Sequence, residues 1–227
     1  MSFGDILTKY RDGVSQTNGY INMAYESDSH GNDVFDDEKK DFIISSAFLK
    51  MFIFWEEFLE SSFLTYLTGE PSTSGTTVDC CVTPRDLDHA SEILIGTQNY
   101  VDWASCDVVR RLAKIYLSDG DPISSNLLSI SRELADLKTV RNAAAHMSST
   151  TGHKFNALAT RVLGVHTTNG KVSQFAPPKI ENELIVVSTT SVKRNSDRNE
   201  TNDERISRHY YFNILDLLLD DHESFLV

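Results

Sequence analysis

The chain has 227 residues, of which 40% are hydrophobic and 24% are charged, so it is long enough to bury one sizeable core and unlike a disordered polymer. Its formal net charge of −12 argues against broad electrostatic binding to nucleic acid, because such binding depends on many Lys and Arg contacts to phosphates. Any nucleic-acid site must therefore be local.

The cysteines and the first residues bear on the cellular compartment. Cys80, Cys81 and Cys106 form no paired disulfide framework, which favours a reducing environment. The first residues lack the basic start and continuous apolar stretch of a signal peptide, and no later window is apolar for the length of a membrane span. We therefore expect a soluble, cytoplasmic protein with no membrane partner.

The first half of the chain predicts helices. Residues 1–27 suit one or two short helices interrupted near Asn18-Gly19. Residues 41–69 predict a long core helix ending at Gly69, because large apolar side chains recur every three or four positions. These side chains are Phe48, Phe52, Trp55, Leu59, Phe63 and Tyr66.

Four further helices are expected before residue 165. Thr83 as cap and Pro84 at the first helical position predict a helix that runs through about Leu94. Ser105 caps a helix that stops at the turn formed by residues 118–122. The next helical run has a buried stripe from Leu127 to Ala144, with a terminator at 148–152, and a further helix covers 153–164.

The predicted fold class is therefore all-α, a helical bundle in a single domain over residues 1–227. A short extended segment is expected near 184–192, because these residues are β-branched and apolar. It belongs to a peripheral segment, residues 166–205. An amphipathic helix over 206–226 follows it.

One short segment carries side chains suited to chemistry. Arg141, Asn142 and His146 place a permanent cation, an amide and an imidazole near the end of a helix. Asn142 and His146 are expected to share a helix face, whereas Arg141 and His146 point about 140° apart at about 100° per residue. One helix cannot easily direct both side chains at one substrate, but two helices that meet across a two-fold axis could. The three intervening alanines allow such a close approach.

This set of groups suits cleavage of RNA by its own 2′-hydroxyl. The imidazole of His146 can move a proton, and the guanidinium of Arg141 can stabilise charge that develops on the phosphate. Asn142 could orient either His146 or the phosphate. The chemistry requires no metal and no cofactor, and we expect neither.

The sequence also resembles the HEPN family. The segment RNAAAH at 141–146 is similar to the Arg-Asn-x-x-x-His form of the HEPN motif. The order WEEFLESSF, YVDWASCDVVRR, DLKTVRNAAAHMS and HKFNALATRVLG is similar to the RiboL-PSP-HEPN branch over roughly residues 40–165, the expected core. The resemblance implies a helical bundle that dimerises through its motif helices, and an acidic residue on the preceding helix. Either Glu56 or Glu57 could supply that acid.

What the resemblance implies for function is a metal-independent endoribonuclease in a toxin–antitoxin or antiphage setting. The substrate would be RNA, with a structured RNA such as a tRNA as one candidate, and an antitoxin or defence-complex protein would be a second partner. Lys138 and Lys154 flank the motif and are candidates for phosphate contacts.

A non-catalytic HEPN interaction module is the alternative, since some members of the family are inactive. In a still simpler alternative, Arg141 forms a surface salt bridge and His146 complements the negative end of the helix dipole. Glu56 and Glu57 would then be one solvent-facing and one hydrogen-bonded carboxylate.

Overall fold

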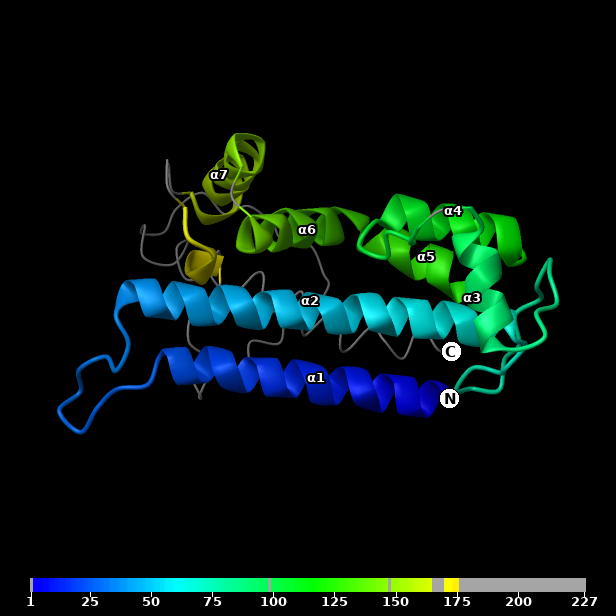
Figure 1. Cartoon of the computed structure of the whole chain (residues 1–227), viewed down its shortest axis with the longest axis horizontal. Coiled ribbons are helices and arrows are strands. Elements are labelled where there is room, and N and C mark those ends of the chain that lie inside the picture. The colour runs from blue at the N-terminus through cyan, green and yellow to red at the C-terminus, as the bar shows by residue number, and fades with distance from the viewer. Residues whose placement is uncertain (1, 98, 147, 165–169, 176–227) are drawn as a thin grey trace, which may run out of the picture.

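The computed structural model describes residues 2–97, 99–146, 148–164 and 170–175. This part of the chain contains seven α-helices, a short 3-10 helix η1 (Val172–Phe175) and no strand, which confirms the all-α prediction for it (Figure 1). The expected extended segment 184–192 and the expected helix 206–226 lie outside the described residues. Among the helices that the structure describes, none combines the length and the apolar character that a membrane crossing demands.

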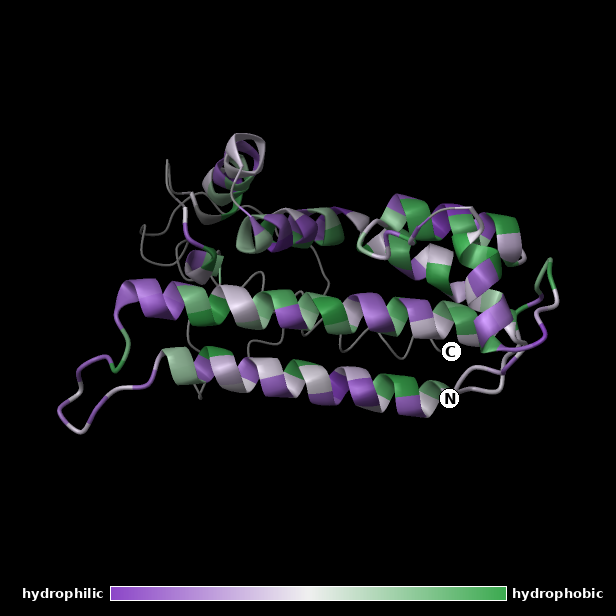
Figure 2. Ribbon diagram, viewed as in Figure 1, coloured by the Kyte–Doolittle hydropathy of each residue, from purple (hydrophilic) through white to green (hydrophobic). Residues whose placement is uncertain are grey.

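The architecture is built around α2 (Asp37–Leu67), which lies between α1 (Phe3–Ala24) and α6 (Ser131–Ala145) (Figure 1). Because α2 packs against helices on two sides, it needs apolar residues on more than one face. Figure 2 shows hydrophobic residues repeated along most of α2 after its hydrophilic first turns. The whole predicted stripe is buried, which confirms that prediction: Phe48, Phe52, Trp55, Leu59, Phe63 and Tyr66.

The helix α1 is continuous, so the predicted interruption near Asn18-Gly19 is wrong. A Cβ placed on Gly19 would meet no atom within 4 Å, so this glycine fits an ordinary helix. Its cost of about 1 kcal/mol relative to alanine is offset by the burial of apolar side chains on both sides of it. Val14 packs in the main core, and Ile21 packs with Ile44 of α2.

The helix α3 (Leu87–Ile95) starts later than the sequence predicted. Thr83 and Pro84 precede it without regular secondary structure, and Asp86 is the N-cap residue. The Asp86 carboxylate accepts a hydrogen bond from the backbone N–H of His89 at 2.8 Å. The prediction failed because two capping candidates lie three residues apart, and a carboxylate next to the helix competes well with a hydroxyl.

Removal of the observed cap should destabilise the protein more than removal of the predicted one. We expect Asp86→Ala to lower the free energy of unfolding by about 0.5–2 kcal/mol, because one N–H of the first turn loses its acceptor. Thr83→Ala is the matched control, with a change within about 0.5 kcal/mol. Urea denaturation of both variants measures this. A larger loss in Thr83→Ala than in Asp86→Ala would contradict the observed helix start.

The predicted run from Leu127 to the motif is two helices, α5 (Pro122–Ser129) and α6, separated at Ile130. Ile130 has φ −111° and ψ 14°, outside the helical region. The Ser129 hydroxyl donates to the Asn126 carbonyl and the Ser131 hydroxyl donates to the Leu128 carbonyl. Such local bonds compete with helical hydrogen bonding, which explains a break that the apolar spacing did not predict.

The remaining helices are α4 (Cys106–Tyr116) and α7 (Ser149–Leu163). The end of α4 before the turn at 118–122 confirms the predicted stop. The helix α7 begins at Ser149, because the Ser148 hydroxyl accepts from the N–H of Thr151 at 3.2 Å. The segment 148–152 therefore starts a helix, and its prediction as a terminator was wrong.

Candidate functional site

The motif residues lie at the C-terminal end of α6. Val140 and Ala143 face the core, so Arg141 and Asn142 are only partly buried at its edge. His146 is exposed and follows the last helical residue, with φ −164° and ψ 135°. Its backbone N–H still donates to the Asn142 carbonyl at 3.0 Å. The expectation that Asn142 and His146 share a helix face is therefore wrong, because the chain becomes extended at His146.

Arg141 contacts two side chains. Its Nη1 donates to Asn142 Oδ1 at 3.2 Å, and its Nη2 lies 3.5 Å from Glu56 Oε1 on α2. The Asn142 amide therefore lies beside the guanidinium, whereas the sequence left its partner open between His146 and the phosphate. The Arg141 side chain keeps 33% of its surface exposed, so part of its hydrogen-bonding capacity faces solvent.

The structure distinguishes the two acidic candidates. Glu56 is directed toward α6 and Arg141, whereas Glu57 forms an ion pair with Lys9 of α1 at 2.9 Å. Adjacent positions on a helix are rotated by about 100°, so the two carboxylates reach the neighbours on different sides of α2. Glu56 belongs to the candidate site, and Glu57 does not.

A second ion pair extends the site. Lys138 lies one turn before Arg141 on α6 and donates to Asp102 Oδ2 at 2.8 Å. Asp102 was not predicted, because its contact with Lys138 spans 36 positions of the chain and follows no local pattern. We call Glu56, Asp102, Lys138, Arg141 and Asn142 the Glu56–Arg141 cluster.

The cluster changes the interpretation of the basic residues near the motif. Lys138 is partly occupied by Asp102, so a phosphate would have to compete with that carboxylate. Lys154 lies exposed on α7 and forms no ion pair with any described residue. Of the two lysines it is therefore the one that could contact a phosphate without first losing a carboxylate partner. In the described residues, no group of three or more His, Cys, Asp or Glu side chains is placed to hold a metal ion.

Burial raises the pKa of Glu56 above its ordinary value of 4.5. Arg141 and Lys138 act in the opposite direction and lower it, whereas the nearby Asp102 raises it further. The attraction to Arg141 does not overcome the loss of hydration, because 3.5 Å is a long separation for an ion pair. The Glu56 carboxylate therefore holds the Arg141 side chain only weakly.

This shift predicts a pH dependence of stability. Because the pKa of Glu56 is higher in the folded state than its ordinary 4.5, the folded state binds the proton more tightly. The stabilisation of the wild type relative to Glu56→Gln should be greatest below pH 4.5 and should fall as pH rises through the raised pKa. Urea denaturation of both proteins between about pH 4 and pH 7.5 measures the difference. A difference that grows with pH would mean that Arg141 dominates over burial.

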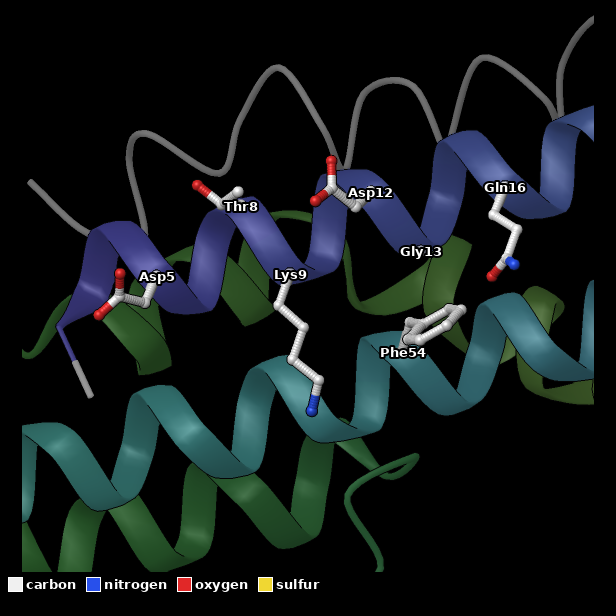
Figure 3. A pocket seen from close by; sticks show the side chains of 7 residues that line it. All are labelled: Asp5, Thr8, Lys9, Asp12, Gly13, Gln16 and Phe54. Carbon is white, nitrogen blue, oxygen red and sulfur yellow. The ribbon is translucent and has the colours of Figure 1, made fainter.

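A large cleft lies elsewhere in the molecule. It has a volume of about 660 Å³ and is lined by residues of α1 and by Phe54 of α2 (Figure 3). The helix α1 lies on the side of α2 opposite α6 (Figure 1). Figure 3 shows Lys9 reaching down toward α2 while Thr8 and Asp12 point away from it, so the polar groups do not converge on one point. Lys9 is already paired with Glu57. The cleft along α1 is therefore a weaker candidate for a catalytic site than the Glu56–Arg141 cluster, whose polar side chains lie together.

Comparison with protein-family models, with curated proteins and with solved structures finds no match to this chain. The resemblance to the HEPN family therefore rests on the sequence motifs at 141–146 and around them.

Proposed function

We propose that this protein is a metal-independent endoribonuclease of the HEPN type, active in the cytoplasm in a toxin or antiphage defence setting. The observation that supports it best is the arrangement at the end of α6. There, Asn142 and Glu56 hold a partly exposed Arg141, and an exposed His146 follows. A permanent cation and a proton-transfer group thus lie at one solvent-accessible helix end.

In the proposed reaction an imidazole of His146 accepts the proton of a 2′-hydroxyl. The 2′-oxygen then forms a bond to phosphorus, and the bond from phosphorus to the 5′-oxygen breaks. A second proton donor protonates the leaving 5′-oxygen, so the products carry a 2′,3′-cyclic phosphate and a 5′-hydroxyl. Arg141 stabilises the negative charge on the phosphate oxygens, and Asn142 holds its guanidinium in place.

We propose that a homodimer formed through α6 supplies the second donor. Of the three alanines in the motif, Ala143 is buried and Ala144 is partly buried, so Ala145 is the one whose small exposed side chain would let a second copy approach closely. A two-fold axis there would bring two copies of Arg141 and of His146 to one cleft. Because the net charge of −12 offers little general attraction, the RNA would have to be recognised locally, and a structured RNA such as a tRNA is a candidate.

A non-catalytic interaction module is the second candidate, and the Arg141–Glu56 contact favours it. A carboxylate that permanently neutralised Arg141 would leave the fold intact and remove the chemistry. The contact is long and Arg141 keeps 33% of its side-chain surface exposed, so we favour the enzyme. In either case, an antitoxin or another defence protein could cover the end of α6.

The test is an incubation of purified protein with total cellular RNA in excess chelator, followed by analysis of the new ends. We expect cleavage that resists the chelator and leaves cyclic phosphates, which block ligation through the 3′-hydroxyl until the phosphate is opened and removed. The protein concentration should span the range over which the dimer forms, because the proposed site needs two copies. Absence of any new ends over that range would favour the interaction module.

A further inference from the structure

A second cleft opens where the C-terminal half of α2 meets α3 and the chain segment 99–103, near the right-hand end of α2 in Figure 1. It has a volume of about 210 Å³. Its apolar wall is formed by Leu94, Ile95 and Val101, and two aromatic residues, Tyr100 and Trp103, also line it. Glu60 is the only charged residue among the described residues that line it.

Glu60 is a carboxylate without a cationic partner in the described part of the chain. No Lys or Arg there forms an ion pair with it, in contrast to Glu56 and Glu57 on the same helix. Burial raises its pKa, a hydrogen bond from the Trp103 side chain lowers it, and the neighbouring Glu57 raises it. A half-buried carboxylate held by one indole therefore faces the cleft with capacity for a further donor.

Aromatic side chains in the lining are a second feature that favours positive charge, where a ring face is open to the bound cation. Tyr100 keeps 72% of its surface exposed at the edge of the cleft, which is unusual for a large aromatic side chain that serves only packing. The face of an aromatic ring attracts a cation that lies within about 6 Å of it. Carboxylate, aromatic rings and an apolar wall together match a cationic head on an apolar stem.

We propose that this cleft binds a single alkylammonium or guanidinium group, with the charged head at Glu60 and the apolar stem against Leu94, Ile95 and Val101. Its size supports one such group, because pockets for drug-sized ligands start at about 300 Å³. Glu60 would repel a nucleotide phosphate, and none of the residues that line the cleft belongs to the Glu56–Arg141 cluster. The inference does not depend on the proposed ribonuclease activity.

The cationic group can come from two sources. One is a Lys or Arg side chain of a partner protein, and the other is a free polyamine. Both present the same head and stem, so the chemistry of the cleft alone does not separate them. A polyamine, however, carries several ammonium groups, whereas the described lining offers one carboxylate.

Binding can be followed through the tryptophans, of which the chain has two. Trp55 is fully buried in the core, and Trp103 lines the cleft. In a ¹H–¹⁵N spectrum the indole N–H resonance of Trp103 therefore reports on the cleft, and that of Trp55 serves as the internal reference. Trp103→Phe assigns them. We expect n-butylammonium chloride to shift the Trp103 resonance in a saturable manner and to leave that of Trp55 unchanged. n-Butanol, at matched ionic strength, should bind at least about tenfold more weakly, because it lacks the charge.

Two variants test the role of the carboxylate. Glu60→Gln should weaken n-butylammonium binding about tenfold, since the amide can still accept the Trp103 hydrogen bond but carries no charge. Glu92→Gln is the matched control, because Glu92 is an exposed carboxylate on α3 that does not line the cleft. Equal binding of n-butanol and n-butylammonium to the wild type, or no Trp103 shift with either probe, would overturn the proposal without recourse to any variant.

Two further probes separate the sources of the cation. Nα-acetyl-lysine methylamide represents a protein side chain, and spermidine represents a polyamine. If spermidine binds no tighter than its number of ammonium groups predicts, a partner side chain is the source. If it binds much tighter, the cleft selects the polyamine. Failure of both to bind competitively with n-butylammonium would overturn the proposal.

Discussion

Replacement of His146 by alanine is expected to lower the rate of RNA cleavage by a factor of about 10²–10⁴. In the proposed mechanism His146 is the group that moves the proton, and alanine cannot do so. The same replacement should leave the thermal midpoint nearly unchanged, because His146 is exposed and follows the last residue of α6. Single-turnover cleavage of a defined RNA, with melting curves of both proteins, measures the two effects separately.

His30→Ala is a suitable control, because His30 is exposed in the loop between α1 and α2 and lies far from the motif in the sequence. It should cut at the wild-type rate. Arg141→Ala should also lose most of the activity, whereas Asn142→Ala should lose less, because Asn142 acts through Arg141. Wild-type cleavage by His146→Ala would remove His146 from the mechanism, even if the protein remained a ribonuclease.

Gly13→Ala is expected to lower the free energy of unfolding by about 1–3 kcal/mol. Gly13 is buried on α1, where the Phe54 ring of α2 packs against it (Figure 3). A Cβ at this position would lie 2.5–2.7 Å from three atoms of that ring, too close for any side chain. The ring must then move, and its contact with the Lys50 ammonium, which lies over it at 4.6 Å, must change with it. Urea denaturation measures the loss.

Gly19 provides the matched control on the same helix. A Cβ there meets nothing within 4 Å, so Gly19→Ala should stabilise the protein by about 0.5–1 kcal/mol through helix propensity alone. In a Phe54→Ala background the ring is absent, and Gly13→Ala should then become neutral or stabilising. If Gly13→Ala remained as destabilising without the ring as with it, the contact between α1 and α2 would not be its cause.

The sequence predicted best where a single helix decides the outcome. The apolar spacing from Phe48 to Tyr66 identified the buried face of α2, and Gly69, with φ +80°, follows its end as expected. These features depend on local geometry, because side chains three and four positions apart share a helix face. The sequence was less accurate at helix starts and breaks. At Asp86 and Ile130, several local hydrogen-bonding groups compete, and small differences in energy select one.

The motif itself can also be identified from the sequence, because Arg141, Asn142 and His146 are close together in the chain. The side chains that these residues contact cannot be identified in that way. The choice of Glu56 over Glu57 depends on which side of α2 faces α6, and the partner of Lys138 comes from a loop 36 positions away. The direction of His146 depends on where α6 ends, since an extended residue points its side chain differently from a helical one.

The sequence by itself thus determined the all-α class, the buried face of the central helix and the identity of the motif residues. All three follow from side-chain chemistry and from spacing within one element. Only the tertiary structure decided that Glu56 faces Arg141, that Asp102 holds Lys138 and that Phe54 requires a glycine on α1. These contacts join separate helices or loops, and their energies depend on packing distances that no local pattern encodes.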